Sequence, residues 1–229
     1  MNDIGLIAIE AISAALAFTL ARFMLKPYEY THESRYLGLP LGFASLGASY
    51  IFMAAALSFS EPFIIEQMKW LQLFTGAYAF AFLATIYYFS QKAPKRNINL
   101  LLQTLLSLLI LGLVISYLIV LVPPTFVLPS YKVVDEYFRT VNMILAIYVA
   151  ICTLRHHALK PDPKTILAPL GYALLAFSQY SFLIWSFDSS FSAFVGAHII
   201  RLGSLLVFFF VSYKVFITPQ TADIRKRCS

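Results

Sequence analysis

The stretch AFVGAHIIRLGSLLVFFFVSYKVF, residues Ala193 to Phe216, decides the fold because it is long and apolar enough to cross a bilayer. It also contains a histidine, His198, and an arginine, Arg201, among residues otherwise suited to lipid. A guanidinium inside a bilayer costs from about 3 to more than 10 kcal/mol, depending on its access to water and headgroups. Arg201 therefore requires a counter-ion or a polar cavity.

The rest of the chain has the composition of a membrane protein. It has 229 residues, of which 60% are hydrophobic and 12% charged, and its mean hydropathy is +0.76. A span needs roughly 20 apolar residues. The sequence predicts an all-α, polytopic membrane protein with seven transmembrane helices, at residues 4 to 25, 36 to 58, 67 to 90, 98 to 122, 137 to 154, 165 to 187 and 193 to 216. The connections are short, so we expect one seven-helix domain over 1–217 and a short basic cytoplasmic tail over 218–229.

Basic residues predict the orientation of these helices. Most of the 17 lysines and arginines flank the first, third and fifth connections or lie in the tail, whereas acidic residues gather on the opposite side. Lys and Arg are retained on the cytoplasmic side more readily than they are translocated. The amino terminus is therefore predicted outside and the carboxyl terminus inside, in a multi-pass protein of the cell membrane. The net charge of +6 is explained by topology and does not indicate nucleic acid.

An internal similarity relates the second and sixth predicted helices. Residues 40–49 read PLGFASLGAS and residues 169–178 read PLGYALLAFS, with six of ten positions identical at an offset of 129. At the same offset, Gln72 occupies the position that corresponds to Arg201. The offset suggests two parallel three-helix units joined by a linking helix, a 3+1+3 arrangement. The alternative is a chance match, because Pro, Leu, Gly and Ala are common in membrane helices.

Polar residues of six predicted helices fall in one layer of the outer half, as estimated from a rise of about 1.5 Å per residue. Tyr180 is placed in the same layer. The candidate ligand-binding residues are Glu10, Tyr50, Gln72, Asn142, Gln179, His198 and Arg201. One interpretation is a polar small-ligand pocket in which Glu10 is the counter-ion of Arg201. A second is a buried salt bridge that clasps the first and last helices, with interhelical hydrogen bonds of about 0.6 to 2 kcal/mol each. A third is a proton or ion path.

Motifs for catalysis or cofactor binding were not found. The sequence has no nucleophile elbow, no zinc-protease motif and no phosphate-binding loop. The adjacent His156 and His157 point about 100° apart on a helix and cannot easily chelate one metal ion. We therefore expect no catalytic residue, no metal site and no cofactor, and the sequence favours a protein that is not an enzyme.

Two segments carry a resemblance to a known family. THESRYLGLPLGF at residues 31–43 and HIIRL at residues 198–202 are similar to the seven-helix membrane sensor regions of prokaryotic histidine kinases. This resemblance implies a sensing role. The chain extends about 13 residues beyond its last predicted helix, so a partner would have to supply the signalling output.

Three functions fit the sequence. The first is a receptor-like or sensor-like protein that binds a small ligand in the outer half of the bundle and passes a helix rearrangement to a membrane or signalling protein partner. The second is a small 3+1+3 transporter, and the third is an accessory subunit of a larger membrane complex. In each case the expected surroundings are a lipid bilayer and no nucleic acid.

Overall fold

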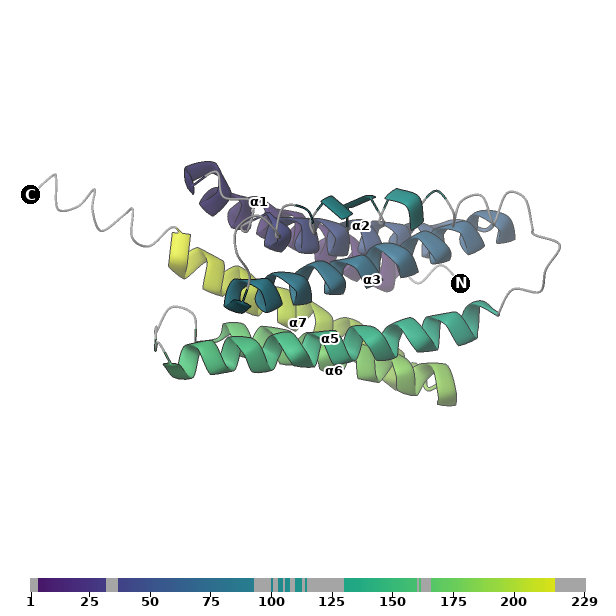
Figure 1. Cartoon of the computed structure of the whole chain (residues 1–229). Helices are drawn as coiled ribbons and strands as arrows, with labels where there is room; N and C mark the ends of the chain where they lie inside the picture. The colour runs from purple at the N-terminus through teal and green to yellow at the C-terminus, as the bar shows by residue number, and fades with distance from the viewer. Residues whose placement is uncertain are drawn as a thin grey trace, which may run out of the picture.

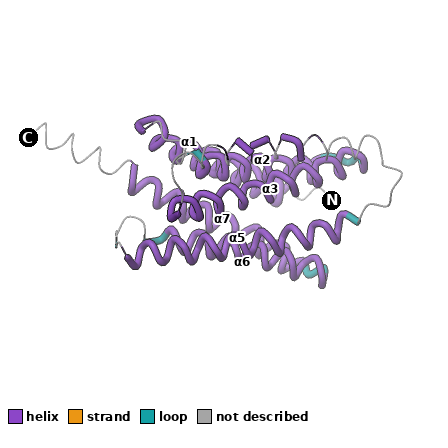
Figure 2. Tube along the Cα trace, in the orientation of Figure 1, coloured by secondary structure: helices purple, strands orange, loops and turns teal. Residues whose placement is uncertain are grey.

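Six long helices make up most of the described structure. The computed structural model describes residues 4–31, 37–92, scattered positions between 100 and 114, 130–159, 161 and 166–216. The helices are α1 (Ile4–Thr31), α2 (Gly38–Ser58), α3 (Pro62–Lys92), α5 (Tyr131–Leu159), α6 (Ala168–Asp188) and α7 (Phe191–Phe216). Figure 2 shows these helices with short loops, and no strand occurs in the described ranges.

Each of these six helices is long and apolar enough to cross a membrane. The shortest have 21 residues, which at about 1.5 Å per residue matches a hydrocarbon core of about 30 Å. The prediction of an all-helical polytopic membrane protein is confirmed for six spans. Most of the predicted span at 98–122 and the whole predicted tail at 218–229 lie outside the described residues, so a seventh span and the orientation stay predictions.

The six helices form a closed ring in chain order. α1 packs on α2, α2 on α3, α3 on α5, α5 on α6, α6 on α7, and α7 returns to α1. Figure 1 shows α1, α2 and α3 together in one half of the bundle and α5 and α6 in the other, with α7 reaching from α6 towards α1. The first and last helices are therefore neighbours, as the pairing of Glu10 with Arg201 requires.

Two glycines allow the close approach of α2 to α3 and of α6 to α7. A Cβ added at Gly42 would lie 2.8 Å from Leu83 Cδ2, and one added at Gly171 would lie 2.7 Å from two atoms of the Phe208 ring. Both distances are below van der Waals contact, so a larger residue would push the helices apart. Phe43, which is fully buried, packs edge-on against Phe208.

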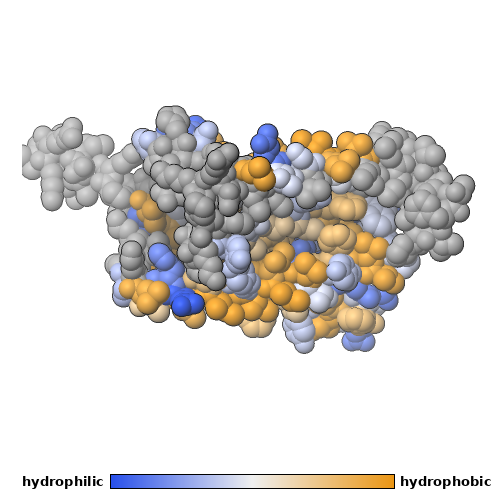
Figure 3. Space-filling model, viewed as in Figure 1, coloured by the Kyte–Doolittle hydropathy of each residue, from blue (hydrophilic) through white to orange (hydrophobic). Residues whose placement is uncertain are grey.

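Apolar side chains cover the outside of the ring as well as its core. Figure 3 shows hydrophobic residues (orange) across the middle of the side formed by α5, with hydrophilic residues (blue) mostly towards the two ends. Ile144, Ile151 and Phe177 are each more than half exposed. Such exposure is costly in water and favourable in lipid, which agrees with a membrane-embedded bundle.

Helix positions correspond between the two halves of the chain. The starts of α5, α6 and α7 lie 127, 130 and 129 residues after those of α1, α2 and α3. Buried positions correspond as well at an offset of 129. In α1 these are Leu6, Glu10, Ser13, Ala17 and Leu20, and in α5 they are Asp135, Arg139, Asn142, Ala146 and Val149.

Three details differ from the sequence-based prediction. α3 begins at Pro62 and α5 at Tyr131, earlier than the predicted starts at residues 67 and 137, because charged residues in the first turns were assigned to connections. Tyr180 is 51% exposed on the outside of the ring and does not belong to the polar layer. Its neighbour Gln179 points inward, since consecutive helical residues are about 100° apart.

Candidate functional site

The structure brings the seven predicted site residues together at the centre of the ring. Six of them line one small cavity of about 30 Å³, namely Tyr50, Gln72, Asn142, Gln179, His198 and Arg201. The seventh, Glu10, is fully buried and contacts both His198 and Arg201. The residues come from α1, α2, α3, α5, α6 and α7, so every helix of the ring contributes at least one, and α7 contributes two.

The predicted ion pair between Glu10 and Arg201 is present. Arg201 Nη2 donates a hydrogen bond of 2.5 Å to Glu10 Oε1, and His198 Nδ1 lies 2.7 Å from the same oxygen. Because a carboxylate oxygen only accepts hydrogen bonds, Nδ1 carries the hydrogen in this contact. Arg201 Nη2, which lies 2.9 Å from Nδ1, then sits beside that atom without a hydrogen bond to it. One carboxylate oxygen therefore ties two side chains of α7 to α1.

Aromatic rings surround these charged groups. The Arg201 guanidinium lies 4.3 Å from the centre of the Tyr50 ring. His198 packs edge-on against Phe182 and Phe194, at 5.0 and 4.5 Å between ring centres. A cation over an aromatic face gains about 0.5 to 2 kcal/mol, so the Tyr50 ring stabilises the buried guanidinium.

A second buried ion pair, missed by the sequence analysis, lies beside the first. Arg139 Nε donates to Asp135 Oδ2 at 2.6 Å within α5, and both side chains line the cavity. The Arg139 guanidinium lies 4.4 Å from the centre of the Phe182 ring, and that of Arg201 lies 5.8 Å from the same centre. The spacing of four residues between the acid and the base was the available signal for this pair.

Several polar atoms in or beside the cavity have no hydrogen-bond partner in the described structure. They include both acceptors and donors: Glu10 Oε2, Tyr50 Oη, Gln72 Oε1, Asn142 Oδ1, His198 Nε2 and Arg201 Nε. A buried polar group without a partner costs about 1 to 3 kcal/mol. A volume of about 30 Å³ accommodates roughly two water molecules, given a need of about 10 to 15 Å³ for each. The site is therefore rich in unused hydrogen-bonding capacity but narrow.

Along the helix axes, all these residues lie towards the same end of the bundle. Glu10 is six residues after the start of α1 and His198 is seven after the start of α7, or about 9 and 10 Å along each helix. Asp135 lies in the first turns of α5. The polar site therefore occupies the half that holds the amino ends of α1, α5 and α7.

Comparisons with models of protein families, with curated proteins and with solved structures find no match to this chain. The class of the protein rests on its own structure. Six helices of membrane-spanning length and hydropathy, arranged around a buried polar site, indicate a multi-pass helical membrane protein.

Proposed function

We propose that the chain is a receptor-like protein of the cell membrane, which binds a small polar ligand at the centre of the ring and responds with a helix rearrangement. The observation that carries this proposal is the group of unpartnered donors and acceptors around the cavity. A ligand with both hydrogen-bond donors and acceptors would satisfy groups that are otherwise unfavourable in a membrane interior.

The narrowness of the cavity supports a coupling between binding and movement. A volume of about 30 Å³ is too small for a molecule of more than a few atoms, so a larger ligand must separate the helices. The Glu10–Arg201 pair joins α1 to α7 beside the cavity, so it would hold these two helices together while other helices of the ring separate. A ligand that bonds better to the separated state would shift the population towards it. We expect the site in the outer half, with the response passed to a partner protein on the inner side.

A second candidate function is a small 3+1+3 transporter. It is favoured by the correspondence of helix starts at offsets of 127 to 130 residues and by the match of buried positions between α1 and α5. Transporters with parallel repeats hold their substrate at the interface between the repeats, near the middle of the membrane. The polar site here also lies between α1–α3 and α5–α7, although nearer to one end of the bundle than to its middle.

Ligand-dependent stabilisation of the purified protein tests the proposed binding. The thermal midpoint would be measured in detergent with a panel of amino acids, small carboxylates and polyols. We expect at least one solute to raise the midpoint of the wild type, and the Asn142→Leu and Gln72→Leu variants to lose that response. The matched control is Thr153→Val in α5, whose hydroxyl bonds within its own helix. If no solute stabilises the wild type, the proposal fails.

Flux measurements separate the two candidate functions. The protein would be reconstituted into liposomes with the stabilising solute inside, and exchange of labelled solute would be followed. A receptor should bind the solute, but the rate of solute exchange should not exceed that of liposomes without the protein. Exchange that is lost in the Asn142→Leu variant would assign the protein to transport.

A further inference from the structure

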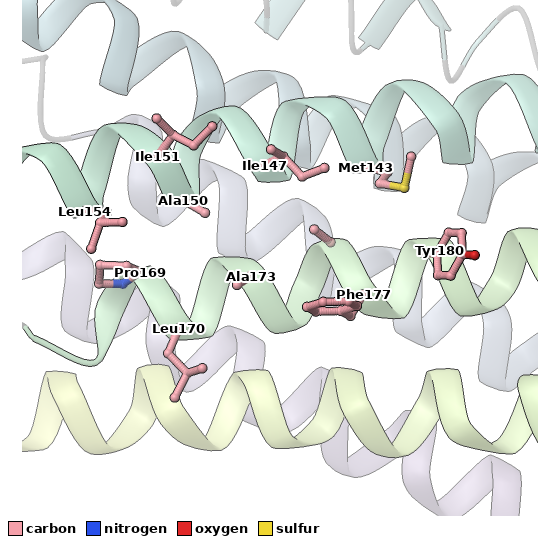
Figure 4. Close-up of a pocket in the computed structure, with 11 residues that line it drawn as sticks. Met143, Ile147, Ala150, Ile151, Leu154, Pro169, Leu170, Ala173, Phe177 and Tyr180 are labelled. Atoms are coloured by element: carbon pink, nitrogen blue, oxygen red, sulfur yellow. The ribbon is translucent and has the colours of Figure 1, made fainter.

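A second cavity, unrelated to the polar site, lies on the outside of the ring between α5 and α6. It is a groove of about 530 Å³, lined almost wholly by apolar atoms. Figure 4 shows its lining residues along two neighbouring helices, from Met143 to Leu154 on α5 and from Pro169 to Tyr180 on α6. Small side chains such as Ala173 create the space, and the exposed Phe177 flanks it.

The groove is as long as one leaflet of a bilayer. Its limits are 11 residues apart on α5 and again 11 residues apart on α6, or about 16 Å along either helix. The hydrocarbon core is about 30 Å thick, so the groove covers about half of it. A partner helix or a second copy of the chain would run along the whole thickness, whereas an acyl chain from one leaflet fits this length.

Positive charge marks the end of the groove that lies nearest the membrane surface. Arg155 is exposed and follows Ile151 by one turn of α5, so it lies on the same helix face as that lining residue. In the described part of the chain, Arg155 has no acidic partner. α6 begins at Ala168, beside the lining residue Pro169, and the amino end of a helix attracts anions.

The corresponding place between α1 and α2 is filled by the protein itself. The Phe18 ring lies 2.9 Å from the position that a Cβ at Gly47 would take, so the ring rests directly on the glycine. At an offset of 129, these residues correspond to Ile147 and Ala176, which both line the groove. The groove therefore lies where α5 has Ile147 in place of the aromatic ring that α1 has at Phe18.

We propose that the groove between α5 and α6 binds an acyl chain of an anionic phospholipid, whose phosphate contacts Arg155 and the amino end of α6. The apolar lining explains the affinity for a hydrocarbon chain, and the length of the groove selects a lipid of one leaflet. The charge at its surface end selects an anionic headgroup. The headgroup end of this site lies towards the opposite end of the bundle from the polar cluster, and the proposal does not depend on the function proposed for that cluster.

Competition between two lipids with identical chains tests the proposal. The purified full chain in detergent would be titrated with dioleoyl phosphatidylglycerol or dioleoyl phosphatidylcholine, and bound lipid would be counted by native mass spectrometry. We expect one molecule of phosphatidylglycerol to bind tightly and phosphatidylcholine to bind more weakly. Arg155→Gln should lower the affinity for phosphatidylglycerol by roughly fivefold, the equivalent of about 1 kcal/mol per basic residue near an anionic surface. The affinity for phosphatidylcholine should not change. Lys214→Gln, in the last turn of α7, is the matched control and should have no effect.

Filling the groove tests its part in binding. Ile147→Phe places a ring at the position that corresponds to Phe18 of α1, and Ala173→Phe fills the groove from α6. If one variant does not fold, the other still tests the proposal. We expect both to lose the bound phosphatidylglycerol, while Leu206→Phe on the exposed side of α7 retains it. Equal binding of the two lipids by the wild type, or lipid retention in both filled variants, would overturn the proposal. A change of oligomeric state in the filled variants would overturn it too, by showing a second copy as the occupant.

Discussion

Removal of the Arg201 charge should reveal how much the buried ion pair contributes to stability. Glu10 is fully buried and Arg201 is 4% exposed, and they are joined by a hydrogen bond of 2.5 Å. Arg201→Met keeps an unbranched apolar stem but removes the guanidinium, and so leaves the Glu10 carboxylate without its main counter-ion. Glu10→Gln leaves the guanidinium charge unpaired, and the double variant removes both charges.

The expected magnitudes follow from the burial of the pair. Loss of one partner of a buried pair costs about 3 to 5 kcal/mol, because the other charge stays buried. Arg201→Met also loses the contact with the Tyr50 ring, which adds about 0.5 to 2 kcal/mol. The double variant should be much more stable than the sum of the single variants predicts, since replacement of a whole buried pair is often neutral. The coupling energy should therefore reach at least about 3 kcal/mol.

The assay is a double-mutant cycle of unfolding free energies, measured by titration with a denaturing detergent in mixed micelles and followed by tryptophan fluorescence. The single variant His198→Phe removes the other contact of the Glu10 carboxylate, in which His198 Nδ1 lies 2.7 Å from Oε1. It shows how much that contact alone contributes to stability. A coupling energy below about 1 kcal/mol, the range of exposed pairs, would refute the reasoning. It would mean that water or headgroups solvate both charges and that the ion pair does not clasp the helices.

Two further predictions concern packing and the second ion pair. Gly171→Ala should destabilise the bundle by about 1 to 3 kcal/mol, because its Cβ would meet the buried Phe208 ring at 2.7 Å. The matched control is Gly203→Ala in α7, where a Cβ has nothing within 4 Å. The control should be neutral or stabilising in the same detergent titration. Asp135→Asn should cost about 3 to 5 kcal/mol by leaving Arg139 buried without a counter-ion, and equal stability of Asp135→Asn and wild type in that titration would contradict the pairing.

The polar site was largely predictable because charge inside a membrane span has few explanations. A rise of about 1.5 Å per residue was enough to place Glu10, His198 and Arg201 at one depth, and the structure brings all three into contact. Depth alone does not determine which way a side chain faces. Tyr180 has the right depth but lies on the outside of α6, whereas Gln179 lines the cavity.

The second ion pair was missed for a different reason. A hydropathy pattern ends a span at the first cluster of charged residues, so Asp135 fell in the connection before the span predicted at 137 to 154, and Arg139 fell in the first turn of that span. In the structure they neutralise each other at a spacing of four, and neutral pairs can extend a helix into the membrane. The groove between α5 and α6 could not be predicted either, because it depends on how Ala173 and Ile147 pack across two helices.

The proposed repeat gives the two ion pairs unequal roles. At an offset of 129, Glu10 corresponds to Arg139 and Gln72 to Arg201, so the α1–α7 contact corresponds to the α5–α3 contact. The first contact has an ion pair between helices, whereas Arg139 takes its carboxylate from its own helix. In the described ranges, no ion pair joins α3 to α5. A ligand that separates the two units therefore has no charge pair to break on the α3–α5 side, and the ring should open there first, with the α1–α7 side as the hinge.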